Sequence, residues 1–179
     1  MGNTAGTTES DMNLQRVCVH EVGHFYLAYT YRPERAVSIC ISRQVNTDVQ
    51  TGQEYASAGH VITFEPDYSL PKVLVSIRAA GLAAESLIYG ESFEDLMNGA
   101  SVRCSVKTDT NNAKRDLERA GLSPSTEDEF ISFYWRAGFS DAVCMMRESV
   151  DKLQSIAEYC LANLDRDIPK SDLVSACNL

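Results

Sequence analysis

The stretch His20-Glu21-Val22-Gly23-His24 decides how the rest of this chain is interpreted, and it has the form H-E-x-x-H. On an α-helix, residues four positions apart lie on one face, so both imidazoles can reach a single metal ion. Glu21 lies beside the pair, near enough to take a proton from a water molecule that the metal activates. Only three histidines occur in the chain, and two of them are here. The stretch predicts a zinc site with His20 and His24 as metal ligands and Glu21 as the catalytic general base.

The flanks of the motif predict that it lies on a buried helix. Two imidazoles on a buried stripe need polar partners, and a metal ion would supply one. We expect the helix to cover about residues 11–31. Gly23 costs such a helix about 1 kcal/mol relative to Ala, which we interpret as a sign that another backbone segment passes close by. Apolar residues at helical spacing continue the face that carries the two histidines: Val17, Leu27 and Tyr31.

Length and composition are those of an ordinary globular domain. The chain has 179 residues, of which 44% are hydrophobic and 23% charged, and this length suits one domain. We predict a disordered tail over residues 1–10 and a single zinc-peptidase-like domain over 11–179. Within it, the C-terminal helices of about 126–179 are expected to form a helical subdomain. The net charge of −9 disfavours nucleic acid as a partner.

Several absences bear on where the protein works. No apolar run approaches the length that crosses a bilayer, and the N-terminus lacks the basic and apolar regions of a secretory signal. The six cysteines include no C-x-x-C pair and are interpreted as reduced thiols. We therefore expect a cytoplasmic protein without direct membrane insertion.

The remaining pattern predicts a mainly α fold with a small β-sheet near the motif (α+β). Residues 36–42 alternate as a strand does, and 59–64 are interpreted as a second strand. Residues 92–105 are interpreted as irregular. Helices are expected over about 70–89 and 106–120, and from Thr126 and Ser140 onward.

A catalytic zinc ion takes three protein ligands and leaves one position for water, so a third ligand is needed. His60, the remaining histidine, could be a ligand or a group that contacts substrate. Glu85 lies in an otherwise apolar helix, where a carboxylate needs a partner. Asp109 lies near the start of another predicted helix, where an acid is favourable without any metal. Spacing alone does not decide between Glu85 and Asp109.

Four segments resemble the peptidase domain of the FtsH-type ATP-dependent zinc metalloproteases. Residues 19–24 are similar to that family's HEAGH motif, and 36–39 to the strand that follows it. Residues 80–91 resemble its GGRAAEE-like helix. Residues 99–101 together with 108–113 resemble its GASNDL segment, whose Asp is the third zinc ligand.

The resemblance implies a zinc-dependent metalloendopeptidase in which Zn²⁺ is held by His20, His24 and Asp109. Glu85 would then orient a ligating histidine from outside the metal's own ligands, or serve as the alternative ligand. The implied fold is an FtsH-like peptidase domain with a zincin-type HExxH helix. The chain lacks the G-x-x-x-x-G-K-[S/T] loop that binds ATP phosphates. We therefore expect peptides or unfolded proteins as substrates, and a separate ATPase or a homo-oligomer as candidate partners.

The strand that begins Gly59, His60, Val61, Ile62 is a candidate for pairing with an extended substrate. Two other interpretations stay open. One is a non-catalytic, peptidase-like adaptor or regulatory binding module, and the other is a helical domain without metal. The presence of Glu21 favours an enzyme, because a structural metal site has no use for a carboxylate that activates water.

Overall fold

The structure of the chain is a computed structural model, and it describes residues 9–42, 45–47, 54–56, 60–63, 67–100 and 104–179. These residues are mostly helical and include small antiparallel sheets, which confirms the α+β class. The elements in chain order are α1 (Glu9–Tyr31), β1 (Ala36–Cys40), β2 (Val45–Thr47), β3 (Glu54–Ala56), β4 (His60–Thr63), α2 (Pro71–Tyr89), α3 (Phe93–Ala100), α4 (Cys104–Arg119), α5 (Glu127–Glu129), the π-helix η1 (Phe130–Trp135), α6 (Arg136–Met146), the 3₁₀-helix η2 (Arg147–Ser149), α7 (Val150–Leu161), β5 (Asp167–Pro169) and α8 (Lys170–Cys177).

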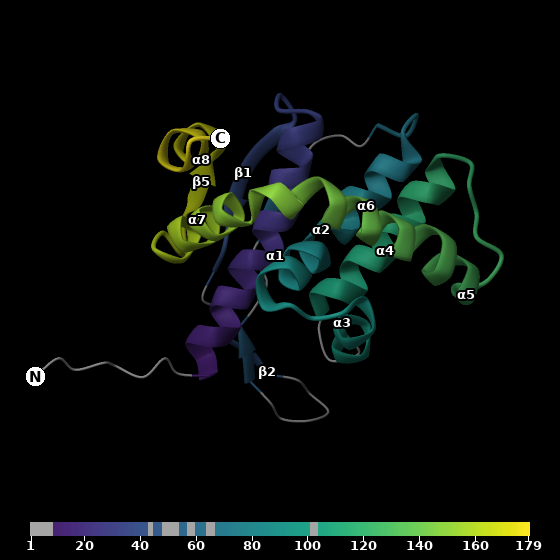
Figure 1. Cartoon of the computed structure of the whole chain (residues 1–179), viewed down its shortest axis with the longest axis horizontal. Coiled ribbons are helices and arrows are strands. Elements are labelled where there is room, and N and C mark those ends of the chain that lie inside the picture. Colours follow the sequence, from purple (N-terminus) through teal and green to yellow (C-terminus); the bar gives the residue numbers. More distant parts are fainter. Residues whose placement is uncertain (1–8, 43–44, 48–53, 57–59, 64–66, 101–103) are drawn as a thin grey trace, which may run out of the picture.

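The motif lies on α1, which runs through the middle of the molecule (Figure 1). β5 and α8 lie on one side of it, and α3, α4 and α5 lie on the other. The helix begins at Glu9, so residues 9 and 10, which we predicted as part of the tail, are helical. The rest of the predicted tail, residues 1–8, lies outside the described residues.

A small sheet packs beside α1 in the order β4-β1-β5, with both pairings antiparallel. Ile39 of the central strand β1 pairs with Val61 of β4 and with Ile168 of β5. The predicted strands are thus present as β1 and β4. β5 was not predicted, because three residues ending in Pro169 give no alternating pattern, and proline is tolerated only at a sheet edge.

The central helix is α2, which packs against α1, α4 and α6. It covers Pro71–Tyr89, one residue shorter at its start than the predicted range of about 70–89, and Gly90 follows it; Gly90 has a φ of 71° and its N–H donates to the carbonyl of Ser86 (2.9 Å). Small side chains allow neighbouring backbones to approach α2 closely. The buried small residues are Ala79, Ala80, Gly81, Ala83 and Ala84.

After α2, the structure contains a helix that was not predicted and a helix that begins earlier than predicted. Residues predicted as irregular form α3, and its start is capped because the Ser92 hydroxyl donates to Asp95 (2.6 Å) and accepts from the Asp95 N–H (3.1 Å). The helix expected to begin at Ser140 is already under way at Arg136 as α6. The break lies later, at η2.

The C-terminal helices share the core of the motif helix rather than forming a hydrophobic core of their own. Trp135, Leu153 and Ile156 belong to the same buried cluster as Phe25 of α1 and Leu82 of α2. α7 packs against α1, and β5 extends the sheet of β1. Residues 126–179 are therefore part of the packed unit that holds the motif.

The length and apolar character of the helices bear on whether any of them could cross a membrane. Within the described ranges, no single helix is both long and apolar enough to cross a bilayer. Pro71–Tyr89 and Phe93–Gly99 meet the length and composition criteria only as a pair, bent by 115°.

Candidate metal centre

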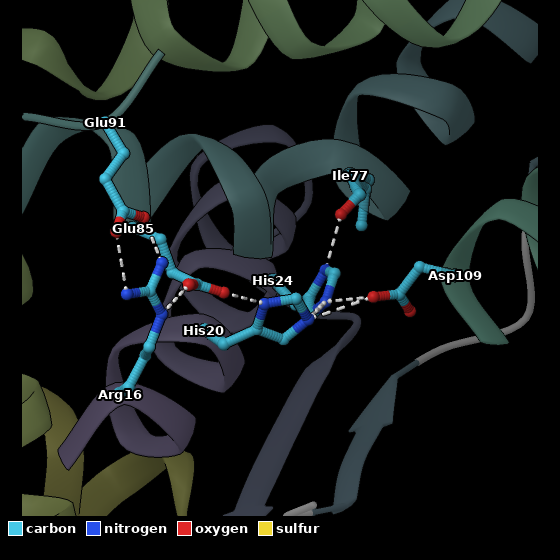
Figure 2. Close-up of polar contacts among 7 residues, drawn as sticks. All are labelled: Arg16, His20, His24, Ile77, Glu85, Glu91 and Asp109. Atoms are coloured by element: carbon cyan, nitrogen blue, oxygen red, sulfur yellow. Dashed lines mark hydrogen bonds and ion pairs between the residues drawn. The ribbon is translucent and has the colours of Figure 1, made fainter. Parts of the chain in front are cut away.

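α1 places His20 and His24 one turn apart, on the face that meets α2 (Figure 2). Both residues are buried, with 3% and 7% of their surface exposed. Their Nε2 atoms lie 3.2 Å apart. The spacing in the motif thus brings two ring nitrogens to one point inside the protein.

Two glycines make this approach possible. A Cβ on Gly23 would lie 2.2 Å from the carbonyl oxygen of Ala80 in α2. The structure thereby confirms that a second backbone segment passes close to Gly23. A Cβ on Gly81 would lie 2.6 Å from His20 Nε2 and 2.7 Å from His24 Nε2. The missing side chain of Gly81 therefore leaves space beside the two nitrogens.

Asp109 reaches the same point from α4. Its Oδ2 lies 3.0 Å from His20 Nε2 and 3.2 Å from His24 Nε2. The side chain is only 14% exposed. Of the two carboxylates that the sequence left open, Asp109 is the one that faces both ring nitrogens.

The opposite edges of the two rings have fixed partners. His20 Nδ1 donates to Glu85 Oε1 at 2.8 Å, and His24 Nδ1 donates to the main-chain carbonyl of Ile77 at 2.7 Å (Figure 2). A carbonyl or carboxylate oxygen can only accept, so each Nδ1 carries the hydrogen. In the neutral rings both Nε2 atoms therefore carry lone pairs.

Three acceptors thus converge: two Nε2 lone pairs and one carboxylate oxygen. Acceptors this close repel one another unless a proton or a metal ion lies among them. A tetrahedral zinc ion with bonds of about 2.0–2.2 Å holds its ligand atoms about 3.3–3.6 Å apart. The observed separations of 3.0, 3.2 and 3.2 Å are a few tenths of an ångström shorter than that, so a small outward shift of the three atoms would make room for an ion. His20, His24 and Asp109 could therefore hold a divalent metal ion, and such a donor set suits zinc and other first-row metals.

The same crowding shifts two pKa values in the metal-free protein. Burial lowers the pKa of His20, but hydrogen bonds and charges from Asp109 and Glu85 outweigh it and raise this pKa to about 10. Burial raises the pKa of Asp109, but the charge of His24 and the hydrogen bonds of both histidines hold it well below its ordinary value. A proton on His20 satisfies the cluster when metal is absent, and a metal ion would displace it.

Behind His20 lies an ion-pair network that we call the Arg16 clamp: Arg16, Glu85, Tyr89 and Glu91. The Arg16 Nε–H donates to Glu85 Oε2, and its two Nη groups donate to the two oxygens of Glu91, one of them at 3.0 Å (Figure 2). The guanidinium also lies 5.1 Å from the centre of the Tyr89 ring. Glu85 is only 1% exposed, so the clamp supplies a countercharge to a buried carboxylate.

The other predicted site residues are placed less completely. Glu21 is buried on α1, with 7% of its surface exposed. His60, Val61 and Ile62 lie in β4, where the backbone of His60 pairs with Cys40. Gly59 lies outside the described residues. Among the described groups, the histidines that join Asp109 are the two of the motif.

Sequence reasoning missed Arg16 and Ile77. Arg16 precedes His20 by the same four residues that separate the histidines, so a charge on this face was the available signal. The role of Ile77 had no signal, because its contribution is a main-chain carbonyl.

A cavity of about 240 Å³ adjoins the site at Ile77. Apolar side chains of α1 and α2 form most of its lining, including Ala28 and Val73. Arg32, Arg35 and Asp67 also line it. Ala28 lies one turn beyond His24 on α1, so the cavity and the centre share one helix face.

Comparisons with known proteins give no independent assignment. A scan against protein-family models finds no match to this chain, and a search of curated proteins finds none either.

Proposed function

We propose that this chain is a zinc-dependent metalloendopeptidase that cleaves unfolded or flexible polypeptides, with a peptidase domain like that of the FtsH-type proteases. The observation that carries the proposal is the convergence of His20, His24 and Asp109, with both rings held so that Nε2 faces the centre. In the metal-free protein a proton on His20 satisfies these acceptors, and a metal ion would take the place of that proton.

In this proposal His20, His24 and Asp109 hold Zn²⁺. When bound, zinc would lower the pKa of a water molecule and polarise the carbonyl to be attacked. Glu21, the residue after the first ligand, takes the proton from the attacking water and passes it to the leaving amine. Glu85 and the Ile77 carbonyl keep the two rings in the tautomer that presents Nε2.

Two features support a polypeptide substrate. β4 is an edge strand of the described sheet, and an edge can pair with an extended chain. The cavity at Ile77 is largely apolar and could take a side chain of a substrate. We assign β4 to backbone recognition and the cavity to side-chain recognition.

Partners and place of action are part of the same proposal. A separate ATPase or an assembly of several copies is proposed to present folded substrates to the centre. The described thiols, such as the buried Cys18 and Cys160, are free, which is the state that a reducing compartment such as the cytoplasm maintains.

Catalysis is tested by comparing the peptide cleavage and the zinc content of the wild type with those of Glu21→Gln. Glu21→Gln is expected to keep bound zinc, because Glu21 is not one of the proposed ligands, and to lower casein or peptide cleavage by about 10²-fold or more, as expected for loss of a general base. Zinc content is measured on the same samples by elemental analysis. Cleavage that survives both a chelator and Glu21→Gln would exclude the mechanism. Bound zinc without any cleavage in the wild type would instead favour a binding module.

A further inference from the structure

We propose that Arg16 is a positioning residue of the metal centre, acting through Glu85 on the orientation of His20; this inference depends on the metal site of the proposed function. Arg16 itself lies on the far side of Glu85 from the metal centre (Figure 2). Its effect is therefore on how well one ligand is held.

The carboxylate of Glu85 joins Arg16 to His20 through its two oxygens. Oε1 accepts from His20 Nδ1 at 2.8 Å, and Oε2 accepts from Arg16 Nε. The two donors approach different oxygens, so the carboxylate plane is fixed at both ends. Without Arg16, Oε2 would lose that donor in a position only 1% exposed, and the carboxylate could turn away from His20.

The side chain of Arg16 is itself held rigidly by its partners. Both oxygens of Glu91 accept from its Nη groups, while its Nε–H is directed to Glu85. The Tyr89 ring lies beside the guanidinium. The backbone at Glu91 is fixed in turn, because its carbonyl accepts from the Ser86 hydroxyl at 2.7 Å. A planar guanidinium can satisfy these partners together, and the single ammonium of lysine cannot reproduce that geometry.

Arg16 and the two histidines are also related by their positions along α1. Arg16, His20 and His24 follow one another at four-residue intervals, so they share one helix face. The clamp joins this face to the C-terminal end of α2 and to the segment before α3. Loss of contacts at that junction should therefore change the orientation of the His20 ring more than that of the His24 ring, because His24 is held separately by the Ile77 carbonyl.

A matched control exists in the Arg78–Asp116 ion pair, which joins α2 to α4 at 3.0 Å. Its side chains are 27% and 5% exposed, against 24% and 2% for Arg16 and Glu85. Loss of either arginine should lower the stability of the metal-free protein to a similar degree. Only loss of Arg16 should act on the metal.

The experiment measures the zinc dissociation constant by competition with a chromophoric chelator, and the visible absorption of the Co²⁺-loaded protein, for four variants and the wild type. Arg16→Met is expected to weaken zinc binding about 10-fold or more, within the 10–100-fold range typical of outer partners of a ligand, and to change the Co²⁺ spectrum. Arg16→Lys should fall between Arg16→Met and the wild type, and Glu91→Gln should show a smaller loss. Arg78→Met should bind zinc like the wild type.

The outcomes separate this inference from the proposed function. Wild-type protein that binds no zinc overturns both. If the wild type binds zinc and both Arg16→Met and Arg16→Lys bind it with the same affinity as the wild type, the role of Arg16 is overturned but the proposed metal site is not. Equal losses in Arg16→Met and Arg78→Met would also overturn it, because the effect would then be general destabilisation. Should Arg16→Met fail to fold, the order wild type, Glu91→Gln, Arg16→Lys in affinity is the test, and any other order contradicts the proposal.

Discussion

His20 and His24 are the same kind of side chain on the same helix, but they are held in different ways. His24 donates to the main-chain carbonyl of Ile77, whose position is fixed by the backbone of α2. His20 donates to the Glu85 carboxylate, which in turn depends on Arg16 and Glu91. One ring thus has a support that side-chain substitution barely alters, and the other has a support built entirely from side chains. We expect the sensitivity of the metal centre to mutation to lie mostly on the His20 side.

The largest effect is expected where both rings are disturbed together. In Gly81→Ala, the new methyl group would lie 2.6–2.7 Å from both Nε2 atoms, so zinc affinity should fall by more than the roughly 100-fold upper range for loss of an outer partner. Competition with a chelator measures it. Gly138→Ala is the control, because its methyl would crowd Val75 Cγ1 at 2.7 Å in the core and should cost stability without changing affinity. Wild-type affinity in Gly81→Ala would show that nothing binds between the rings.

A smaller effect is expected when only His20 loses its partner. In Glu85→Gln, only one acceptor oxygen remains for the two donors His20 Nδ1–H and Arg16 Nε–H. The amide NH₂ group then faces the other donor and cannot accept its hydrogen bond. Zinc affinity should fall about 10–100-fold. Glu94→Gln is the control, since Glu94 forms an exposed ion pair with Arg136 and its loss should leave affinity unchanged. A loss in Glu85→Gln no greater than this control would remove Glu85 from the account.

The asymmetry should also show in the pH dependence of the metal-free protein. The pKa of His20 is raised from 6.5 to about 10. Its charged contacts therefore contribute stability fully below pH 6.5, and this contribution is lost as pH rises through about 10. The midpoint temperature of thermal unfolding, measured in the presence of a chelator, should therefore fall as the pH rises over this range. The buried thiols act in the same direction, since the pKa of Cys18 is raised to about 12, so the difference between wild type and His20→Gln isolates the histidine. Equal pH profiles would contradict this assignment.

The smallest effect is expected on the His24 side. Ile77→Val removes one buried methylene but keeps the carbonyl that accepts from His24. Stability should fall by about 0.5–1.5 kcal/mol, measured by denaturant unfolding, while zinc affinity stays within about 2-fold of wild type. An affinity loss as large as that of Glu85→Gln would contradict the view that the two supports differ.

The same contrast explains what could be predicted from the sequence. The motif helix, the pairing of His20 with His24 and the close approach at Gly23 follow from local spacing, which one helix determines. The geometry around Asp109 and Glu85 depends on how α4 and α2 pack against α1, so spacing left both carboxylates open. Family resemblance, not spacing, favoured Asp109, the carboxylate that faces both ring nitrogens.

Other features had weaker or no local signals. The cap formed by Ser92 and Asp95 was readable, and α3 could have been predicted from it. β5 could not, because three residues acquire strand geometry only by pairing with β1 across most of the chain. The carbonyl of Ile77 is a main-chain group, which no side-chain pattern reveals.

The most direct test of the central claim is the anomalous scattering of crystals of the zinc-loaded protein, recorded on both sides of the zinc absorption edge. We predict one peak about 2.0–2.2 Å from His20 Nε2, His24 Nε2 and an oxygen of Asp109. The absence of a peak there, or a peak bound by Glu85 in place of Asp109, would contradict it.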